Sequence, residues 1–513
     1  MIKIINYIRM HFLVLILGLH GILAILMTGT ALKWYSILGY VAFFSLGFNY
    51  LRLGSYILFI IWSFISISYL PQVILYGDVS SGMIASLFET NANEALEYLK
   101  EIPLYIYIIA ICYLYFSCYI LYTASKQAIF YCLILIFSII YRPIKYIYSD
   151  NLPFSLVNSN FPMISFFLEN YALIKEYKQE RILLEKAKSQ PSTWKIESVI
   201  PNYPLYILVI GESMRLDYLS VYGFPLNTTP FLDKSNGTFY HGYISAAPNT
   251  QPSLLRTLYQ LDKNNKIIAQ NNLISLAKDA GFKTYWLSNQ GMVGEYDNAA
   301  SRVGRQADFS FFTKKGDYKF KNTFDTELLP HFKQIINEPS NKPKLIVLHL
   351  IGSHPIFCER LWQKVEFSYI NENLSCYLQS IKQTDWLLEN IVEELKLQNK
   401  KYSLLYFSDH GLSLQNKSRL GKLTLSVGNE TKQNYLVPLF ILASDAKEHQ
   451  IIPIKQSAIN FLYGFSQWLG ITLIDKSLIQ SSFWQGSTDP IKVYDWNNWV
   501  EFDLLKNEPA IKP

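Results

Sequence analysis

Long stretches without a single charged side chain constrain the fold of this chain more than any other feature of its sequence. Residues 10–32, 53–77 and 102–125 contain no Asp, Glu, Lys or Arg. A bilayer core about 30 Å thick requires roughly 20 predominantly apolar residues for each spanning helix. Downstream of residue 170 the density of charge becomes ordinary. The sequence therefore predicts a membrane region followed by a globular domain.

Five apolar runs predict five membrane-spanning helices. The runs cover residues 12–28, 35–51, 54–73, 103–122 and 127–141. The fifth run is short, but Lys126 and Arg142 at its ends can extend their charged groups to the lipid–water interface. Because further apolar runs follow the first one directly, a cleaved signal peptide is disfavoured. We expect a transmembrane domain over residues 1–145.

Basic residues near the runs predict how these helices are oriented. If the N-terminus is cytoplasmic, the cytoplasmic side carries Lys3, Arg9, Arg52 and Lys126. Four further basic residues lie on the opposite side, so the bias is weak. After five crossings, the C-terminal domain lies outside the cytoplasm.

Charge and composition exclude one class of partner. Only 17% of the residues are charged, compared with about 25% in a typical soluble domain. The net charge of +6 is spread along the chain, without the dense basic patch that binds a phosphate backbone. We therefore expect no nucleic-acid partner, and we expect the protein to act as a monomer.

Two polar segments flank the last apolar runs. The loop at residues 74–102 lies between the third and fourth runs and is acidic. It is either a solvated linker or, from Ser86 onward, a capped amphipathic helix at the outer membrane–water interface. Residues 146–200 form an amphipathic linker, within which 164–188 have the pattern of a helix.

From residue 201 to residue 513 the pattern changes to short β-rich runs that alternate with helical ones. The runs of strand length are 206–210, 284–287, 345–350, 403–407 and 438–442. Their continuous apolarity predicts strands buried on both faces, and hence an α/β domain with a mainly parallel sheet. In such sheets, ligand sites lie at the carboxyl ends of the strands.

Chemically active side chains follow three of these runs. Glu212 follows the first, His354 the third, and the pair Asp409-His410 the fourth. Carboxylate oxygen and imidazole nitrogen suit Zn²⁺, with Mn²⁺ as an alternative. Each residue alone also fits an ordinary structural role, as the neighbour of a helix cap, a loop histidine or a turn residue. Their common position after strands favours a zinc site.

A metal site of this kind can activate a hydroxyl, and Thr250 is the better of two candidates. Ser213 is adjacent to Glu212, and a nucleophile beside its own metal ligand is sterically awkward. Thr250 precedes a predicted helix at 253–258, whose N-terminus would favour the negative charge of a phosphoryl group. The local sequence supports equally well a role in which Thr250 only caps that helix.

Two of the five cysteines, Cys358 and Cys376, lie in the C-terminal domain. A lone pair outside the cytoplasm favours a disulfide, which would stabilise the domain by about 3 kcal/mol for a loop of this length. The alternative is a pair of free thiols in the core.

Six short motifs follow one another along nearly the whole chain. They are Glu-Thr-Asn at 89–91, Ile-Gly-Glu-Ser at 210–213, Tyr-Gly-Phe-Pro-Leu-Asn-Thr-Thr-Pro at 222–230, Ser-Asn-Gln-Gly at 288–291, Gly-Ser-His-Pro at 352–355 and Ser-Asp-His-Gly at 408–411. In order and spacing they resemble the bacterial phosphoethanolamine transferases of the alkaline-phosphatase (sulfatase-like) superfamily. The stretches 352–360 and 376–385 are most similar to the members that modify the core sugar or Kdo of lipopolysaccharide.

The resemblance implies a set of roles. The zinc ligands would be Glu212, Thr250, Asp409 and His410. Thr250 would be the nucleophile, His354 would assist catalysis, and Thr90, Glu94 and His354 would approach the donor. The donor would be phosphatidylethanolamine, and the acceptor a lipopolysaccharide-type glycolipid (core sugar, Kdo or lipid A). The protein would lie in the bacterial inner membrane with a sulfatase-like catalytic domain in the periplasm, and the position of both cysteines inside the two stretches strengthens the disulfide prediction.

The sequence departs from the family pattern in the groups that contact substrate. Leu412 stands where the family has Glu after Asp-His-Gly, and 411–437 contain no histidine, with Leu425 near its expected place. Ser86 replaces an Asn and Val293 a Lys. A second zinc site and the acceptor therefore stay open. The rival interpretations are a phosphoglycerol transferase of the same fold and a catalytically inert envelope protein that binds lipid.

Overall fold

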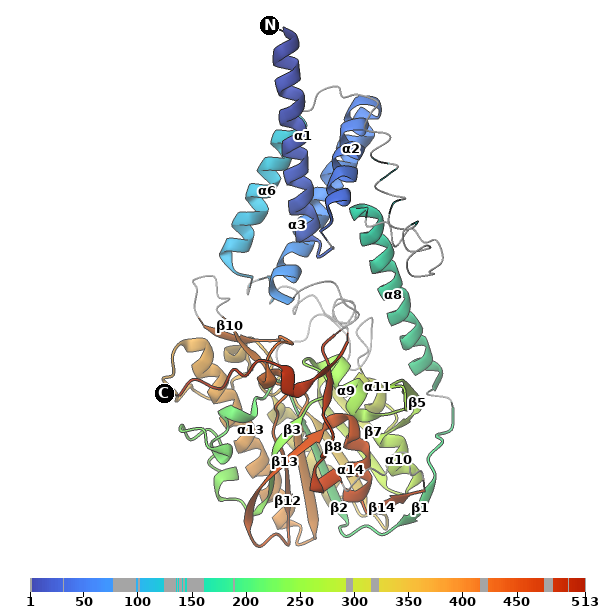
Figure 1. Ribbon diagram of the computed structural model, residues 1–513. Coiled ribbons are helices and arrows are strands. Elements are labelled where there is room, and N and C mark those ends of the chain that lie inside the picture. Colours follow the sequence, from blue (N-terminus) through green and yellow to red (C-terminus); the bar gives the residue numbers. More distant parts are fainter. Residues whose placement is uncertain are drawn as a thin grey trace. The chain divides into compact units, whose positions relative to one another are not determined.

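The computed structural model divides the chain into two compact units, which are described separately (Figure 1). It describes residues 2–30, 32–76, 98–99, 102–123, 161–187, 190–291, 299–314, 323–415, 423–474, 483–496 and 498–512, with 135, 137, 141 and 144. The first unit holds the described residues up to Lys178 apart from 98–99, and the second unit holds the rest.

The first unit is a bundle of apolar helices. Its helices are α1 (Ile2–Met27), α2 (Trp34–Tyr50), α3 (Arg52–Tyr76), α6 (Leu104–Thr123) and the first part of α8 (Pro162–Ala187). Segments Leu53–Leu75 and Leu104–Tyr122 are long and apolar enough to cross a membrane, and α1 and α2 contain shorter apolar segments. The first four predicted spans are thus helical, and so is the predicted linker helix. The fifth, at 127–141, falls almost wholly outside the described residues, so a count of five is not confirmed.

A buried histidine ties four of these helices together. His20 of α1 is fully buried, and its Nδ1 lies 2.8 Å from the Tyr40 hydroxyl of α2. Its Nε2 lies 2.9 Å from the Ser117 hydroxyl of α6. The ring stacks between Phe59 of α3 and Tyr113 of α6, with centroids 4.5 Å from each. Hydrogen bonds of this kind join helices where water is absent.

The second unit is built on an eight-stranded sheet. In spatial order its strands are β13 (His449–Ser457), β3 (Gly237–Ile244), β12 (Leu439–Ala443), β9 (Tyr402–Ser408), β2 (Leu205–Gly211), β8 (Lys344–His349), β6 (Lys283–Gly291) and β7 (Phe309–Lys314). All run in one direction except β12, which is antiparallel to both of its neighbours. The mainly parallel sheet and all five predicted strands are therefore confirmed. Strands β3, β7 and β13 were not predicted, because none of them is a continuous apolar run.

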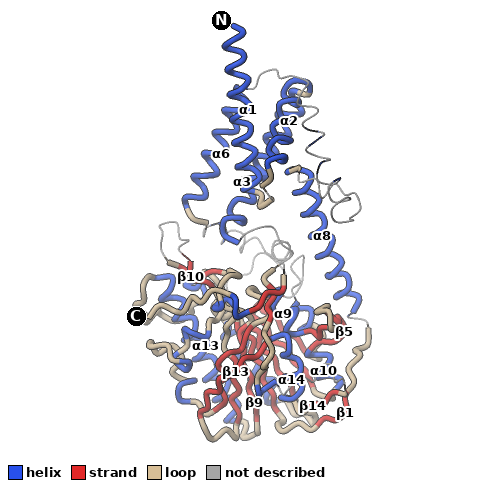
Figure 2. Tube along the Cα trace, viewed as in Figure 1, coloured by secondary structure: helices blue, strands red, loops and turns tan. Residues whose placement is uncertain are grey.

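Helices pack on both faces of this sheet (Figure 2). They are α9 (Thr250–Leu258), α10 (Leu273–Asp279), α11 (Ala299–Gly304), α12 (Leu329–Asn337), α13 (Glu372–Leu397) and α14 (Phe461–Trp468). In β2, Leu205, Ile207 and Val209 enter the core under α12 and α13, while Tyr206, Leu208 and Ile210 enter the core under α9, α10 and α14. Both faces of the strand are covered, which explains why its sequence is apolar without alternation.

Short strand pairs complete the unit. They are β1 (Ile196–Val199) with β14 (Ile471–Leu473), β4 (Tyr259–Leu261) with β5 (Ile267–Asn272), β10 (Ser413–Gln415) with β11 (Thr424–Ser426), and β15 (Lys492–Tyr494) with β16 (Trp499–Glu501). Each of these pairs is antiparallel.

Candidate active site at the strand ends

Two neighbouring parallel strands bring the predicted ligands together. Strands β2 and β9 pair in register, with Gly211 opposite Ser408, so Glu212 and Asp409 leave the sheet side by side. His410 follows Asp409 directly, and all three side chains are almost completely buried. Charged groups are rarely buried to this extent unless they are paired or bind a metal.

The three side chains form a compact cluster. His410 Nε2 lies 3.2 Å from Glu212 Oε1 and 3.5 Å from Asp409 Oδ2. One ligand atom from each residue lies within 4.8 Å of the others, and among the described residues this is the one such group of His, Cys, Asp and Glu.

Thr250 joins this cluster from a different part of the chain. Its Oγ lies 3.2 Å from Glu212 Oε2 and 3.3 Å from His410 Nε2. Thr250 is the first residue of α9, and the N-cap position belongs to Asn249. The hydroxyl points at the carboxylate and the imidazole, and Thr250 does not occupy the N-cap position that the local sequence also allowed. Ser253, one turn later, fixes the helix by donating to the Asp409 carbonyl at 2.6 Å.

Ser213 positions the two carboxylates. Its amide donates to Asp409 Oδ1 at 3.0 Å, and its hydroxyl donates to Glu212 Oε1 at 2.8 Å. The backbone of Ser213 has a φ of 56°, in the left-handed region that non-glycine residues rarely adopt. Tyr377 holds it there by donating to the Ser213 carbonyl at 3.0 Å. Strain of this kind persists where surrounding contacts over-determine the geometry, as they do here.

The cluster concentrates negative charge. Burial and the neighbouring Glu212 carboxylate raise the pKa of Asp409 well above its usual range. Burial alone would lower the pKa of His410, but the charges of Asp409 and Glu212 and the hydrogen bond to Glu212 outweigh it and raise that pKa to about 9. These raised pKa values mean that the buried cluster retains protons, which a bound cation would displace.

These residues fit a divalent metal ion. Asp409 Oδ2 is buried and accepts no hydrogen bond from any residue in the described part of the chain. An orphaned buried acceptor of this kind is costly unless a cation compensates it. Two carboxylates, one imidazole and one hydroxyl are also the donor set that suits zinc. Glu212, Asp409, His410 and Thr250 would hold the ion.

His354 lies in the loop after β8. Gly352 has a φ of 46°, and a side chain there would meet the Glu212 amide nitrogen at 3.0 Å, so the loop passes close against the cluster. Both oxygens of Asp325 fix this loop by accepting from the amides of Ile351 at 2.8 Å and Gly352 at 3.0 Å. His354 itself contributes to the electrostatic field at Glu212. The sequence showed no signal for Asp325, since it follows no predicted strand.

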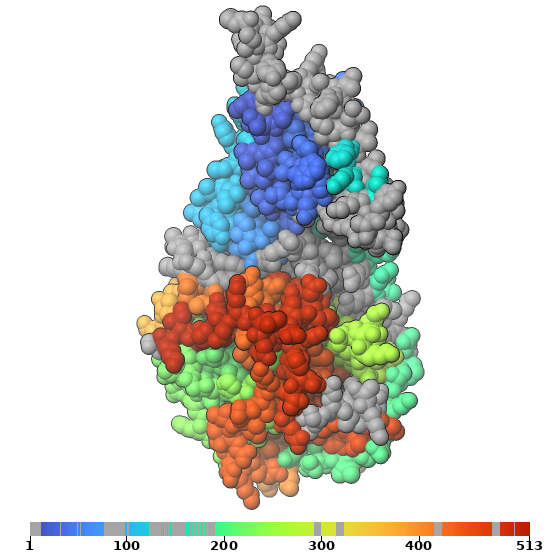
Figure 3. Space-filling model, viewed as in Figure 1, coloured from blue at the N-terminus to red at the C-terminus, as the bar shows by residue number. Residues whose placement is uncertain are grey.

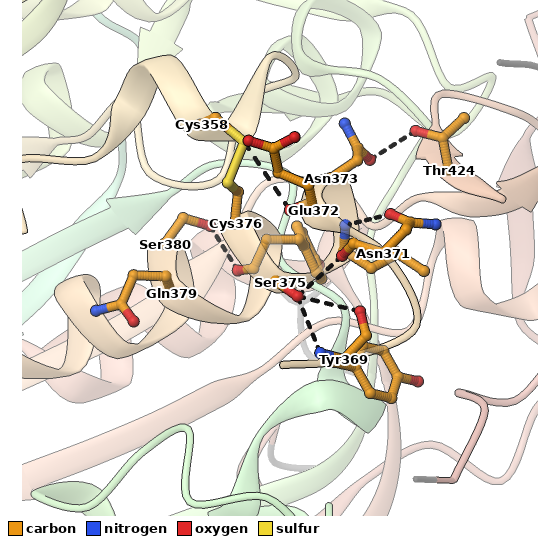
Figure 4. Close-up of a disulfide and its surroundings, with 12 residues drawn as sticks. Cys358, Tyr369, Asn371, Glu372, Asn373, Ser375, Cys376, Gln379, Ser380 and Thr424 are labelled. Atoms are coloured by element: carbon orange, nitrogen blue, oxygen red, sulfur yellow. Dashed lines mark hydrogen bonds between the residues drawn. A yellow bond between two sulfur atoms is a disulfide. The ribbon is translucent and has the colours of Figure 1, made fainter. Parts of the chain in front are cut away.

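The predicted disulfide is present. Cys358, in the 3₁₀ helix η6 (Phe357–Arg360), is bonded to Cys376 of α13 (Figure 4). On the same helix, Tyr377 holds Ser213, and Ser380 donates to the Ser353 hydroxyl at 2.8 Å. The disulfide thus ties the loop after His354 to the helix that supports Ser213.

The family positions that are altered here are part of the core. Leu412 is fully buried, and its carbonyl accepts from Arg215 Nη1 at 3.2 Å. Leu425 of β11 is also buried and packs in the apolar core on the α13 side. Leu425, which lies near the position where the family resemblance implies a histidine, is therefore taken up by apolar packing. Thr90, Glu94, Ser86 and Val293 lie outside the described residues.

Known proteins resemble this chain in sequence and in fold. Residues 204–471 match the family described as Sulfatase. The chain is 34% identical over 420 residues to the phosphoethanolamine transferase OpgE of Escherichia coli K12. The aligned region covers 80% of this chain and 79% of that protein. Two solved structures share the fold. The integral membrane lipooligosaccharide phosphoethanolamine transferase A (EptA) of Neisseria meningitidis has a TM-score of 0.56 at 15% identity, covering 88% of this chain and 95% of that chain. The C-terminal periplasmic domain of E. coli EptC, in complex with zinc, has a TM-score of 0.51 at 23% identity, covering 61% of this chain and 96% of that chain.

Proposed function

This chain belongs to the phosphoethanolamine transferases of the sulfatase family, and we propose that it carries phosphoethanolamine from phosphatidylethanolamine to a lipopolysaccharide-type glycolipid through a phosphothreonine at Thr250. The observation that carries this proposal is the Thr250 hydroxyl, which lies 3.2 Å from Glu212 Oε2 and 3.3 Å from His410 Nε2. A hydroxyl within hydrogen-bond reach of a buried carboxylate and a buried imidazole has the geometry of an activated nucleophile.

In the first step, Thr250 Oγ forms a bond to the phosphorus of the lipid, and the bond from phosphorus to the diacylglycerol oxygen breaks. The proton of the Thr250 hydroxyl is released to the solvent, from which His354 is later reprotonated, and the diacylglycerol oxygen gains a proton. His354 is the proposed donor to the leaving oxygen, since it lies in the loop beside Glu212. The N-terminus of α9 favours the negative charge of the bound phosphoryl group.

In the second step, a hydroxyl of the acceptor attacks the phosphothreonine. The bond from phosphorus to Thr250 Oγ breaks, and the proton of the acceptor hydroxyl returns to Thr250. Bound Zn²⁺, for which Mn²⁺ is the alternative, would lower the pKa of the Thr250 hydroxyl and offset charge on the phosphoryl oxygens. One such ion is supported by the cluster of Glu212, Asp409 and His410.

The proposed location is the bacterial inner membrane, with the second unit in the periplasm. Among the residues that the structure describes, two helices are long and apolar enough to cross a membrane, which supports this location, and membrane attachment suits a lipid donor. Thr90 and Glu94 are proposed to approach the donor headgroup. The proposal of a lipopolysaccharide-type acceptor is based on the motifs at 352–360 and 376–385, which contain His354 and both cysteines of the disulfide.

Mass spectrometry of the purified full chain in detergent tests the proposal. After incubation with phosphatidylethanolamine, the wild type should carry one phosphoethanolamine group on Thr250. Thr250→Ala should carry none, and Thr250→Ser, which keeps a hydroxyl, should carry it at a reduced rate. Phosphatidylglycerol offered instead distinguishes the rival donor. A Thr250→Ala protein that transferred phosphoethanolamine at the wild-type rate would contradict the mechanism.

The acceptor is tested in cells with and without the protein. The glycolipid fraction and the water-soluble glycan fraction of the envelope are analysed separately. A gain of one phosphoethanolamine unit in the glycolipid fraction is expected, and a gain confined to soluble glycan would overturn the acceptor while leaving the donor chemistry intact.

A further inference from the structure

The residue before the nucleophile is held by a hairpin far along the chain. The indole nitrogen of Trp496 donates to the side-chain carbonyl of Asn249 at 2.9 Å, across 247 positions of sequence. Trp496 lies in the turn between β15 and β16. The C-terminal residues, coloured red, spread over one face of the second unit (Figure 3). No motif of the sequence pointed to this tryptophan.

Asn249 does not behave as its residue type and position predict. Asparagine is among the most favoured N-cap residues, because its side chain accepts from the exposed amides of the first turn. Asn249 is the N-cap of α9, yet its side chain makes no capping hydrogen bond. Its carbonyl oxygen is directed to Trp496 instead. The start of α9 is therefore anchored from outside the helix.

The backbone of Trp496 supports a specific role for this contact. Its φ is +86°, a conformation that is a genuine outlier for a bulky side chain. Trp496 is also buried, with 7% of its surface exposed. A strained and buried tryptophan is retained where the surrounding contacts require it.

Further contacts from the same hairpin brace the segment on both sides of Thr250. The amide of Tyr494 donates to the Ala246 carbonyl at 2.9 Å, four positions before the nucleophile. After the nucleophile, the guanidinium of Arg256 lies over the Tyr494 ring at 3.8 Å from its centroid. The hairpin thus contacts the loop before Thr250, the residue next to it and the helix after it.

We infer that Trp496 is a positioning residue for the reaction, which acts through Asn249 to hold the Thr250 hydroxyl in line for attack on the lipid phosphorus. This inference rests on the proposed function of Thr250. Misplacing a reacting group by about 1 Å can cost on the order of 100-fold in rate, while binding of the substrate is unaffected. Loss of the bond from Trp496 should therefore lower the rate of the chemical step and not the affinity for the lipid.

The test is a single-turnover measurement on the full chain in detergent. The rate at which Thr250 acquires phosphoethanolamine is followed by mass spectrometry at increasing concentrations of phosphatidylethanolamine. Trp496→Phe keeps the ring but removes the N–H, and Asn249→Ala removes the acceptor. Each should lower the saturated rate about 10-fold or more, with the half-saturating lipid concentration changed less than about twofold.

Two controls separate positioning from folding. Trp499→Phe makes the same change in the same hairpin, but the indole of Trp499 lies near Arg256, with its ring centroid 5.6 Å from the guanidinium. It should form the adduct at the wild-type rate. The thermal midpoint and the zinc content of Trp496→Phe should also match the wild type.

The double variant Trp496→Phe/Asn249→Ala decides whether the two residues act together. Because they share one hydrogen bond, the double variant should be no slower than the slower single variant. If the rate losses of the two single variants multiply in the double variant, or if Trp496→Phe reacts as fast as Trp499→Phe, the inference is overturned. The proposed function of Thr250 would not be affected by either result. If the wild type forms no adduct at all, the proposed function fails, and this inference fails with it.

Discussion

Each of the two units buries a histidine among polar side chains, and the two clusters are built differently. In the first unit, His20 is surrounded by neutral hydroxyls, with Tyr40 and Ser117 at 2.8 and 2.9 Å. In the second unit, His410 lies against two carboxylates, and Asp409 Oδ2 accepts no hydrogen bond from the described residues. The first cluster is satisfied internally, whereas the second leaves a buried carboxylate oxygen without a hydrogen bond from the described residues.

This difference distinguishes a satisfied polar network from a cluster whose residues could hold a cation. A satisfied neutral network holds helices together and gains nothing from a ligand. A cluster with an orphaned carboxylate oxygen and a nearby hydroxyl is costly until a cation occupies it. The following experiments act on one cluster and use the other part of the molecule as reference.

The largest effect is expected from Asp409→Asn. It removes one carboxylate charge from the cluster, so zinc content should fall from about one ion per chain to nearly none, and transfer should fall by more than about 100-fold, since changes outside a ligand set already cost 10- to 100-fold. Metal analysis and the adduct assay measure both. Asp385→Asn is the matched control: this buried carboxylate accepts from the amides of Phe231 and Leu232 at 2.8 and 3.0 Å, and its loss should leave the zinc content unchanged.

Removal of the disulfide should have the next largest effect. The variant Cys358→Ser/Cys376→Ser should lower the free energy of unfolding of the second unit by about 3 kcal/mol. Thermal unfolding with and without reductant measures this. Cys112→Ser/Cys118→Ser, which changes two free cysteines of α6, is the control and should behave as the wild type. Equal stability of the two variants would contradict the supporting role of the disulfide.

Metal removal should lower the thermal stability of the second unit and leave that of the first unit unchanged. If zinc is present at 100 times its Kd, its binding stabilises the second unit by about 2.7 kcal/mol, and a chelator should remove this stabilisation. Differential scanning calorimetry in detergent should show the transition of the second unit at a lower temperature, and added Zn²⁺ should restore it. A chelator that shifted only the transition of the first unit would contradict the comparison.

The smallest effect is expected from His20→Phe. It removes the short contacts to Tyr40 and Ser117, and interhelical hydrogen bonds in membranes average about 0.6 kcal/mol each, so the helix bundle should lose about 1 kcal/mol. Ser68→Ala, which alters an exposed hydroxyl of α3, should lose nothing. Neither variant should change the zinc content. A loss of zinc in His20→Phe would show that the two clusters are coupled.

The local pattern of the sequence was enough for the elements that lie inside continuous apolar runs. Strands such as β2 and β9 are covered on both faces, so most of their residues are apolar, and a short window contains the signal. The same logic failed for β13, at one edge of the sheet, where most side chains are exposed or half-buried. Edge strands satisfy only one side of the pairing and carry polar residues freely.

The candidate site was predictable where residues directly follow strands, and much less so elsewhere. Glu212, Asp409 and His410 were identified because the ends of parallel strands converge. Asp325 and Trp496 were not, since each acts on a segment remote in sequence: Asp325 on the amides of Ile351 and Gly352, and Trp496 on Asn249. Such contacts depend on the tertiary arrangement of loops, which the hydrophobic periodicity of the sequence does not predict.

The sequence by itself determined the two-part organisation, the mainly parallel sheet and the residues at its strand ends. All three follow from where apolar runs lie along the chain, because apolar side chains are buried away from water. Only the tertiary structure decided what Thr250 faces. Its partners Glu212 and His410 lie 38 and 160 positions away, and they meet it because β2, β9 and α9 pack on one sheet. Local sequence left the roles of helix cap and nucleophile equal for Thr250; in the fold the N-cap position belongs to Asn249, and the Thr250 hydroxyl faces the cluster. The burial of a residue can be predicted from its type and its neighbours in sequence, whereas the distance between remote residues depends on the whole fold.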